Sequence, residues 1–281
     1  MTERLQKLKS LTEPTTKKKP LRHTVKVPKM HPPSVSPKSY CILDPKTKAT
    51  YGHNHLIARE IASLTKITTC VVSLKLRKKF SVDWNTKVEV SKASSSKKGT
   101  SAQLKEGDVL KLHDLFFGLM LPSGNDAAWA LAEFFGSLVS PLDPVKAFIK
   151  EMNQFAKDHK LLLTSFGNPH GLCQKRNLST ASDVCKIAQL ALEDPDFLNI
   201  VKTQSYKASV TNGGVCREQT WTNSNKLIGK GFFGKTGITP KAGPCLCVTN
   251  DKFIITLLSS RSREARWREV KVLANWASKI K

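Results

Sequence analysis

The sequence has no long apolar segment. Its longest uninterrupted apolar run, residues 115–121, is seven residues long, whereas a membrane-spanning helix needs about 18 or more. Residues 1–30 also lack the apolar core of about seven or more residues that a secretory signal peptide carries. The sequence therefore predicts neither a transmembrane helix nor a signal peptide.

Acidic residues are scarce as well. The chain has 22 Asp and Glu against 46 Lys and Arg, which gives a net charge of +24. Residues 1–38 contain ten of the basic residues, two of the acidic residues and six of the 14 prolines, with almost no apolar periodicity. This composition is typical of a disordered basic N-terminal arm.

The excess of positive charge extends beyond this arm. Residues 39–281 still carry +16, which is +24 less the +8 of the arm. Such an excess can simply keep a surface solvated, or it can attract an anionic polymer or a membrane surface. Because no motif that combines basic and aromatic residues accompanies the charge, no nucleic-acid partner is expected.

The seven cysteines include no Cys-x-x-Cys pair. That absence argues against the common zinc and thioredoxin motifs, so neither a metal site nor a cofactor is expected. Cys70 and Cys185 fall on predicted buried helix faces. Buried, reduced thiols would suit a reducing, cytoplasmic compartment, although the sequence leaves the compartment open.

Three short polar motifs follow one another along the chain: Ser63-Leu64-Thr65-Lys66, Ser123-Gly124-Asn125 and Lys235-Thr236-Gly237. Together they supply a nucleophile, a base, a proton relay and an anion clamp. The set matches the Ser-x-x-Lys, Ser-Asp-Asn and Lys-Thr-Gly motifs of penicillin-binding proteins and class A β-lactamases. It favours acyl transfer through a serine ester.

Ser-x-x-Lys alone is a weak signal in this chain, because three other pairs fit it: Ser94/Lys97, Ser95/Lys98 and Ser278/Lys281. Only the Ser63 copy opens an apolar stretch with the i, i+3, i+4, i+7 spacing of a buried helix face, at Ile67, Cys70, Val71 and Leu74. Lys-Thr-Gly and Ser-Gly-Asn each occur once. The ordered triple therefore selects Ser63.

The expected elements are strands, a block of helices, strands again and a closing helix. Strands are predicted at 39–43, 48–51, 88–90, 232–233, 243–249 and 253–258, and helices at 63–79, 112–121, 126–135, 144–159, 181–192 and 263–280. The order predicts an α/β fold with an antiparallel sheet flanked by helices. Residues 39–281 would form one catalytic domain, with an all-helical subdomain of roughly residues 80–200 inserted in the sheet.

A serine hydroxyl is a weak nucleophile until a base removes its proton. Residues i and i+3 are neighbours on a helix, so Lys66 lies beside Ser63. Lysine is a base only when it is neutral, and both burial and a second cation such as Lys235 lower its pKa. The backbone N–H groups of Ser63 and Ile238 are expected to form the oxyanion hole.

The other motif residues fit supporting roles. Ser123 can relay a proton between Lys66 and the leaving group. Asn125 offers a donor and an acceptor to the substrate amide and to Lys66, while Lys235 and Thr236 suit a substrate carboxylate. Gly237 would let a substrate backbone lie against the strand.

Six segments together resemble the serine-type D-alanyl-D-alanine carboxypeptidases, the low-molecular-weight penicillin-binding proteins, over about residues 39–280. They are Ala62-Ser63-Leu64-Thr65-Lys66, Leu121-Pro122-Ser123-Gly124-Asn125-Asp126-Ala127, Asn168-Pro169-His170-Gly171-Leu172, Ser179-Thr180-Ala181-Ser182-Asp183, Asn223-Ser224-Asn225 and Lys235-Thr236-Gly237. The resemblance implies the DD-peptidase/β-lactamase fold and release of the terminal D-alanine from a D-Ala-D-Ala peptide, as in peptidoglycan. It also implies that penicillin acylates Ser63, with Lys66 as the base.

The chain departs from the pattern of that family in several places. Phe232 and Phe233 stand where the family usually has Asp-Gly before Lys-Thr-Gly, and the signal peptide and C-terminal β domain of many members are missing. His170 is expected to order a loop. Two alternatives stay open, a non-catalytic peptide-binding relative and a β-lactamase. The latter needs a glutamate for deacylation, and Glu193 has the wrong spacing for it.

Overall fold

A five-stranded antiparallel sheet carries the third motif. The computed structural model describes residues 31–172 and 177–280. The strand order is β2 (Thr50–His53), β1 (Ser39–Leu43), β11 (Ile254–Leu258), β10 (Gly243–Thr249) and β9 (Phe233–Thr239). The strand with Lys-Thr-Gly, β9, is therefore an edge strand of this sheet.

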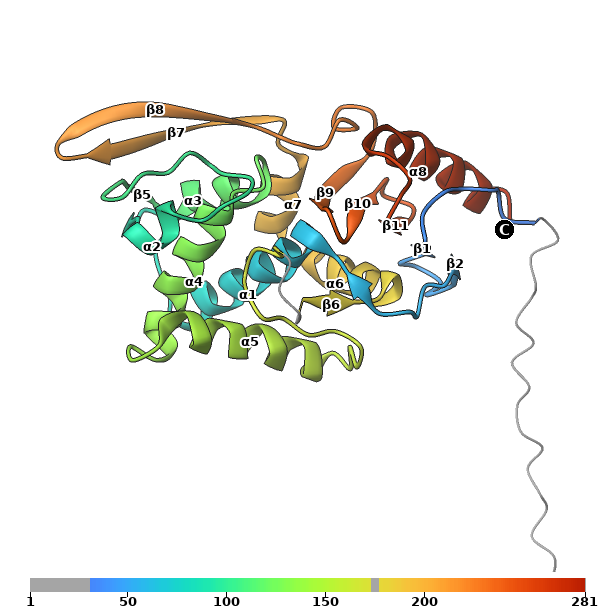
Figure 1. Cartoon of the computed structure of the whole chain (residues 1–281), viewed down its shortest axis with the longest axis horizontal. Coiled ribbons are helices and arrows are strands. Elements are labelled where there is room, and N and C mark those ends of the chain that lie inside the picture. The colour runs from blue at the N-terminus through green and yellow to red at the C-terminus, as the bar shows by residue number, and fades with distance from the viewer. Residues whose placement is uncertain (1–30, 173–176, 281) are drawn as a thin grey trace, which may run out of the picture. The chain divides into compact units, whose positions relative to one another are not determined.

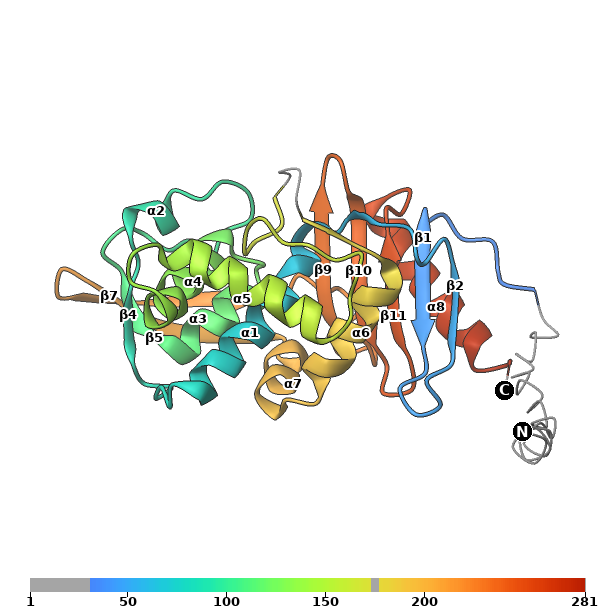
Figure 2. The ribbon, with the colours of Figure 1, turned by 90° about the horizontal axis from the view of Figure 1, so that it is seen from below.

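Helices cover both faces of the sheet. α6 (Ala181–Leu192) packs on β1 and β11 from one side, and α8 (Arg263–Ala277) packs on β10 and β11 from the other, as Figures 1 and 2 show. Every residue of β1 and β11 is buried as a result. Such strands lack the polar alternation of a half-exposed strand.

The bounds of α6 agree with the predicted helix, because Thr180 caps it by accepting a hydrogen bond from Asp183 N at 2.9 Å. Its position against the sheet differs from the expectation that residues 80–200 form one helical subdomain. The helices that pack away from the sheet end with α5.

The helical part surrounds α1 (Thr65–Lys79), which packs against α3 (Leu112–Met120), α4 (Asn125–Val139) and α5 (Pro144–Asp158). Phe116, Phe135 and Phe148 are fully buried there. The shorter elements are β3 (Arg59–Glu60), η1 (Ala62–Leu64), β4 (Lys87–Glu89), α2 (Lys92–Ser95), β5 (Val109–Lys111), β6 (Leu178–Ser179) and α7 (Pro195–Lys202).

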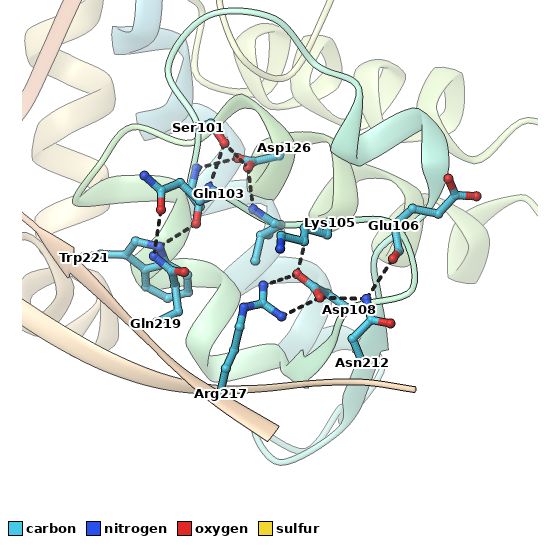
Figure 3. Close-up of polar contacts among 12 residues, drawn as sticks. Ser101, Gln103, Lys105, Glu106, Asp108, Asp126, Asn212, Arg217, Gln219 and Trp221 are labelled. Atoms are coloured by element: carbon cyan, nitrogen blue, oxygen red, sulfur yellow. Dashed lines mark hydrogen bonds and ion pairs between the residues drawn. The ribbon is translucent and has the colours of Figure 1, made fainter. Parts of the chain in front are cut away.

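A long hairpin, β7 (Ser205–Asn212) and β8 (Val215–Thr222), was not predicted. It joins β4 and β5 in a second sheet of order β4-β5-β7-β8 and lies along the helical part (Figure 1). Arg217 donates to both oxygens of the buried Asp108, at 2.7 and 2.5 Å, and Trp221 Nε1 donates to Ala102 O at 2.8 Å (Figure 3). The hairpin thus holds residues 102–108 in place.

We expect Arg217→Met to lower the free energy of unfolding by about 1–3 kcal/mol, because the fully buried Asp108 carboxylate would lose two charged hydrogen bonds. Lys207→Met is the matched control, since it breaks the exposed Lys207–Glu218 pair on the same hairpin and should change stability by about 0.5 kcal/mol or less. Urea denaturation measures both. Equal effects would show that the Asp108 contact does not anchor the hairpin.

Most of the predicted basic arm lies outside the described residues, which begin at residue 31. Its last residues contact the fold. Ser36 Oγ donates to Glu269 Oε2 at 2.9 Å, and Lys38 N donates to Ser259 O at 3.2 Å. The last residues of the predicted arm, at positions 36 and 38, are therefore held against the fold.

Within the described residues, no helix combines the length and the hydrophobicity needed to cross a bilayer. The described cysteines are all free thiols, and only Cys216 is exposed: Cys41, Cys70, Cys185, Cys216, Cys245 and Cys247. Cys173 lies outside the described residues.

Candidate active site

Ser63 lies in a tight turn immediately before α1, rather than inside the first turn of the helix. The turn is η1, and Ala62 adopts a left-handed backbone with φ 49°. Thr65 Oγ1 donates to Ala62 O at 2.9 Å and ties the turn to the helix. The geometry brings Ser63 Oγ to 3.0 Å from Lys66 Nζ.

Lys66 is fully buried and makes two further contacts. Its Nζ donates to Asn125 Oδ1 at 2.6 Å and to His170 O at 2.8 Å. Burial holds the pKa of Lys66 well below its ordinary value, and the nearby charge of Lys235 lowers it further. A neutral amine has two N–H donors and one lone pair, which suits two carbonyl-type acceptors and the hydroxyl of Ser63.

The second motif forms a bend between α3 and α4. Ser123 takes the left-handed conformation, with φ 67°, whereas Gly124 has an ordinary φ of −61°. The left-handed residue of this bend is therefore Ser123 and not the glycine. Gly124 is needed for space, because a Cβ there would lie 2.6 Å from Asp126 Oδ1 and 2.7 Å from Gly118 O.

Two side chains of this bend face the site. Asn125 accepts from Lys66 through Oδ1, and its Nδ2 donates to Lys98 O at 2.6 Å, so it links Lys66 to the loop that begins at Lys98. Ser123 Oγ is buried and has no hydrogen-bond partner among the described residues. Its proton is therefore not committed to another group of the fold.

The loop of residues 98–104 forms one wall of the site. Asn125 N donates to Thr100 O at 2.8 Å, and Thr100 Oγ1 donates to Ser123 O at 2.6 Å. Asp126 accepts from Ser101 Oγ and Ala102 N at 2.6 and 2.9 Å (Figure 3). The bend and the wall are therefore fixed to each other.

The opposite wall is β9. Lys235 is 1% exposed, and its Nζ donates to Thr236 O at 3.0 Å. Burial, with the charge of Arg266, lowers the pKa of Lys235 to about 7. Thr236 Oγ1 lies 2.8 Å from Ser224 Oγ, so the Asn223-Ser224-Asn225 segment adjoins Lys-Thr-Gly.

Gly237 lets β9 pack against the turn that carries Ser63. A Cβ at this position would lie 3.0 Å from Ile61 O and 3.2 Å from Ser63 N. Close approach of a substrate to Gly237 stays a prediction, and the structure shows a second reason for this glycine, the close approach of the Ser63 turn. Ser63 N therefore lies beside the segment of β9 that leads to Ile238.

The loop containing His170 closes the site behind Lys66. His170 Nδ1 accepts from Leu172 N at 3.2 Å, and its ring stacks on Trp129. Burial, with the charges of Lys66 and Lys97, lowers the pKa of His170 to about 3, so the ring is neutral at pH 7. The sequence predicted the loop-ordering role but not the contact of the His170 carbonyl with Lys66.

A cleft of about 340 Å³ opens at Ser63. Its walls include Ser63, Ser123, Thr236, Gly237 and Ile238 from the predicted set. Lys66, Asn125 and Lys235 lie behind this lining, so the structure brings the predicted residues together in two layers. Thr236 lines the cleft and Lys235 does not, and their joint role in binding a carboxylate stays a prediction.

Sequence analysis missed Arg266, which lines the cleft from α8. Its Nη1 donates to Gly237 O at 3.1 Å and to Cys245 O at 3.0 Å, which fixes the guanidinium across β9 and β10. The available signal was its spacing, because Arg266 occupies the apolar stripe that continues through Val270 and Leu273.

Phe233 fills the position where Gly was expected. It is buried and lies under Lys202 of α7, with Nζ 4.5 Å from the ring centroid. Glu193, weighed as a deacylating residue, ends α6 and does not line the cleft. Among the described residues, no three metal-ligating side chains cluster together.

Known proteins of one enzyme family are similar to this chain. A family model for D-alanyl-D-alanine carboxypeptidases, Peptidase S11, matches residues 26–259. The chain is 37% identical over 231 residues to the D-alanyl-D-alanine carboxypeptidase of Streptomyces sp. strain K15, covering 78% of each protein. It is 30% identical over 211 residues to DacF of Bacillus subtilis strain 168, covering 73% of this chain and 51% of DacF.

The fold of the chain is also similar to solved structures. The crystal structure of the Streptomyces K15 DD-transpeptidase matches with a TM-score of 0.81 and 32% identity, over 88% of this chain and 98% of that chain. A DacD carboxypeptidase from Francisella tularensis matches with a TM-score of 0.78 at 24% identity, over 89% and 72% of the two chains.

Proposed function

Because this chain belongs to the Peptidase S11 family of serine-type D-alanyl-D-alanine carboxypeptidases, we propose that Ser63 attacks the bond between two C-terminal D-alanines of a peptidoglycan-type peptide. The acyl part of the peptide becomes an ester on Ser63 Oγ, and D-alanine leaves. Water then hydrolyses the ester. The 3.0 Å contact between Ser63 Oγ and the buried amine of Lys66, whose pKa burial lowers, carries this proposal.

In the first step Lys66 takes the proton of Ser63 as the oxygen attacks the carbonyl carbon. The carbonyl oxygen becomes negative and accepts hydrogen bonds from Ser63 N and Ile238 N. Ser123 Oγ passes the proton from Lys66 to the leaving nitrogen, and the C–N bond breaks. Asn125 holds Lys66 at the distance that this transfer requires.

The carboxylate of the leaving residue lies against Thr236 and Arg266 in the cleft, and Lys235 adds positive charge from behind. We expect kcat/KM to fall as pH rises above about 7, because the pKa of Lys235 is lowered to about 7 and its charge is lost there. Lys66 works in the opposite direction, because it accepts a proton only when it is neutral, and burial lowers its pKa and so favours that neutral form.

Acylation rates for a penicillin and for its uncharged carboxylate ester, measured across pH, test this assignment. The decline above neutral pH should appear for the free acid and be absent for the ester. The same decline with both compounds would assign it to another group.

Penicillin should acylate Ser63 once per chain, and hydrolysis of the resulting ester should be slow. Glu264 is the one acidic side chain that lines the cleft among the described residues, and it is paired with Lys226 at 3.2 Å. Glu264 is exposed on α8 and makes no hydrogen bond to Ser63, Lys66 or Ser123, so it is not expected to activate a deacylating water, as a class A β-lactamase requires. A chromogenic cephalosporin should give stoichiometric labelling, and rapid turnover would favour the β-lactamase alternative.

Two measurements test the proposed function. Mass mapping after incubation with fluorescent penicillin should find the adduct on the peptide that contains Ser63, and Ser63→Ala should abolish it. Wild-type protein should also release free D-alanine from acyl-D-Ala-D-Ala. A folded protein that does neither would be the non-catalytic binder.

The relative from strain K15 is named both a carboxypeptidase and a DD-transpeptidase. An amine acceptor could therefore compete with water for the Ser63 ester, which is measured by adding a D-amino acid and quantifying the new peptide. Peptidoglycan lies outside the cytoplasm, so the proposed substrate gives no support to the predicted cytoplasmic compartment. Attraction of the basic arm to an anionic surface remains a prediction.

A further inference from the structure

The side of the cleft that receives the leaving residue carries more positive charge than one carboxylate requires. Beyond Thr236, the lining residues include three cations, Lys226, Arg263 and Arg266, and one anion, Glu264. Lys235 adds charge behind them. The α-carboxylate of a terminal D-alanine balances one of the lining cations and Glu264 balances a second, which leaves one lining cation without a counterpart.

Arg263 is the clearest surplus cation. It is exposed at the first position of α8, lines the cleft and has no ion pair among the described residues. The N-terminus of a helix already carries partial positive charge, so a cation there does not stabilise the helix. Ser262 caps this end by accepting from Ala265 N at 3.0 Å. Arg263 therefore has no evident structural role.

Lys226 and Glu264 form an exchangeable pair at the same place. Their side chains are 67% and 74% exposed, with Nζ and Oε1 3.2 Å apart. An exposed pair of this kind is weak. A carboxylate that enters the cleft can therefore replace Glu264 as the partner of Lys226.

Arg266 and Trp267 form a buried pair at the base of this region. The Arg266 guanidinium carbon lies 4.3 Å from the centroid of the Trp267 ring, and both residues are 7% exposed. Arg266 Nε and Trp267 Nε1 are buried donors without a partner among the described residues. Both nitrogens lie beneath the surface of the cleft, so the charge of Arg266, rather than these two donors, acts on an anion in the cleft.

We propose that this enzyme prefers a leaving residue with a second negative charge, that is, a C-terminal D-amino acid whose side chain carries a carboxylate. This inference rests on the proposed function and concerns the same acyl transfer. The α-carboxylate contacts Thr236 and Arg266. The side-chain carboxylate extends past Arg266 to Arg263 and Lys226, while the bond that breaks and the path of the proton stay the same.

The test compares acyl-D-Ala-D-Glu with acyl-D-Ala-D-Gln, which has the same shape without the charge. We expect kcat/KM for release of D-Glu to exceed that for D-Gln by about threefold, the size of a partly exposed ion pair. Arg263→Gln should lower the ratio toward one, with Lys226 left as the remaining partner. Glu264→Gln should raise the ratio, because Lys226 then has no internal competitor.

Arg268→Gln is the matched control, since Arg268 is exposed on α8 and does not line the cleft. It removes the same charge from the same helix and should leave the ratio at the wild-type value. High salt should reduce the wild-type ratio by screening. A wild-type ratio of one or less, or a ratio that Arg263→Gln does not lower, would overturn the proposal.

Two measurements distinguish a missing preference for an anionic leaving residue from a missing acyl-enzyme. Release of D-alanine from acyl-D-Ala-D-Ala and labelling by penicillin need no second carboxylate. If both occur without a preference for D-Glu, only the anionic leaving residue is rejected. If neither occurs in folded protein, the acyl-enzyme itself is rejected and the preference with it.

Discussion

Lys66→Ala is expected to lower the rate of acylation of Ser63 by about 10³-fold or more, within the range lost when a general base is removed. Lys66 Nζ lies 3.0 Å from Ser63 Oγ, and no other titratable side chain is recorded in contact with that hydroxyl among the described residues. The loss should appear with penicillin and with acyl-D-Ala-D-Ala, since both require the same serine oxygen.

Lys66→Arg separates proton transfer from positive charge. A guanidinium stays protonated in proteins, so it supplies charge near Ser63 but cannot accept the proton. We expect this variant to be as inactive as Lys66→Ala. Activity near the wild-type level in Lys66→Arg would mean that Lys66 acts through its charge.

The second Ser-x-x-Lys match in the sequence provides the control. Lys97 lies over the Trp129 ring, 3.2 Å from its centroid, and Ser94 Oγ donates to Glu133 Oε2 at 2.7 Å. Lys97→Ala should therefore keep acylation within about threefold of wild type. Stopped-flow acylation with a fluorescent penicillin measures all three variants. Rapid labelling of Lys66→Ala would remove Lys66 from the role of base.

The fold class and the family were predictable from the sequence because the informative signals are local. The apolar spacing after Ser63 marks α1, and Thr180 followed by Asp183 marks the start of α6. The α/β DD-peptidase fold is confirmed by the structural matches to the K15 enzyme. The three ordered motifs include Ser63, Ser123, Thr236 and Gly237, which line the cleft, but they gave no sign of Arg266.

Contacts between distant residues left no such local signal. Arg217 and Asp108 are 109 positions apart, and β8 alternates exposed and partly buried residues without an apolar stripe. The hairpin could not be placed for that reason. The position of Arg266 could not be predicted either, because its partners are backbone carbonyls of two strands that come together only in the folded sheet.

The motifs predicted that glycine is needed at positions 124 and 237, but the sequence did not show which neighbouring atoms exclude a side chain there. A sequence shows that a side chain is absent, not which atom would contact it. Gly237 makes room for the Ser63 turn and Gly124 for Gly118 O. The positive φ of the second motif falls on Ser123 instead.

Gly171→Ala is expected to lower the free energy of unfolding by about 3 kcal/mol or more. Gly171 has φ +87°, and a Cβ there would overlap Ala62 O and lie 2.8 Å from Thr65 Oγ1. Those two oxygens belong to the hydrogen bond that ties the Ser63 turn to α1. The neighbouring His170 O contacts Lys66 at 2.8 Å. Displacing this loop therefore moves the nucleophile and the base together.

Gly214→Ala distinguishes steric overlap from backbone strain. Gly214 has nearly the same φ, +83°, but nothing lies within 4 Å of its Cβ position at the tip of the β7–β8 hairpin. It should cost about 1 kcal/mol and leave acylation unchanged. Thermal unfolding and penicillin acylation, measured on both variants at equal folded fraction, separate the two contributions. If Gly171→Ala destabilised no more than Gly214→Ala and kept full acylation, the His170 loop would not hold the Ser63 turn.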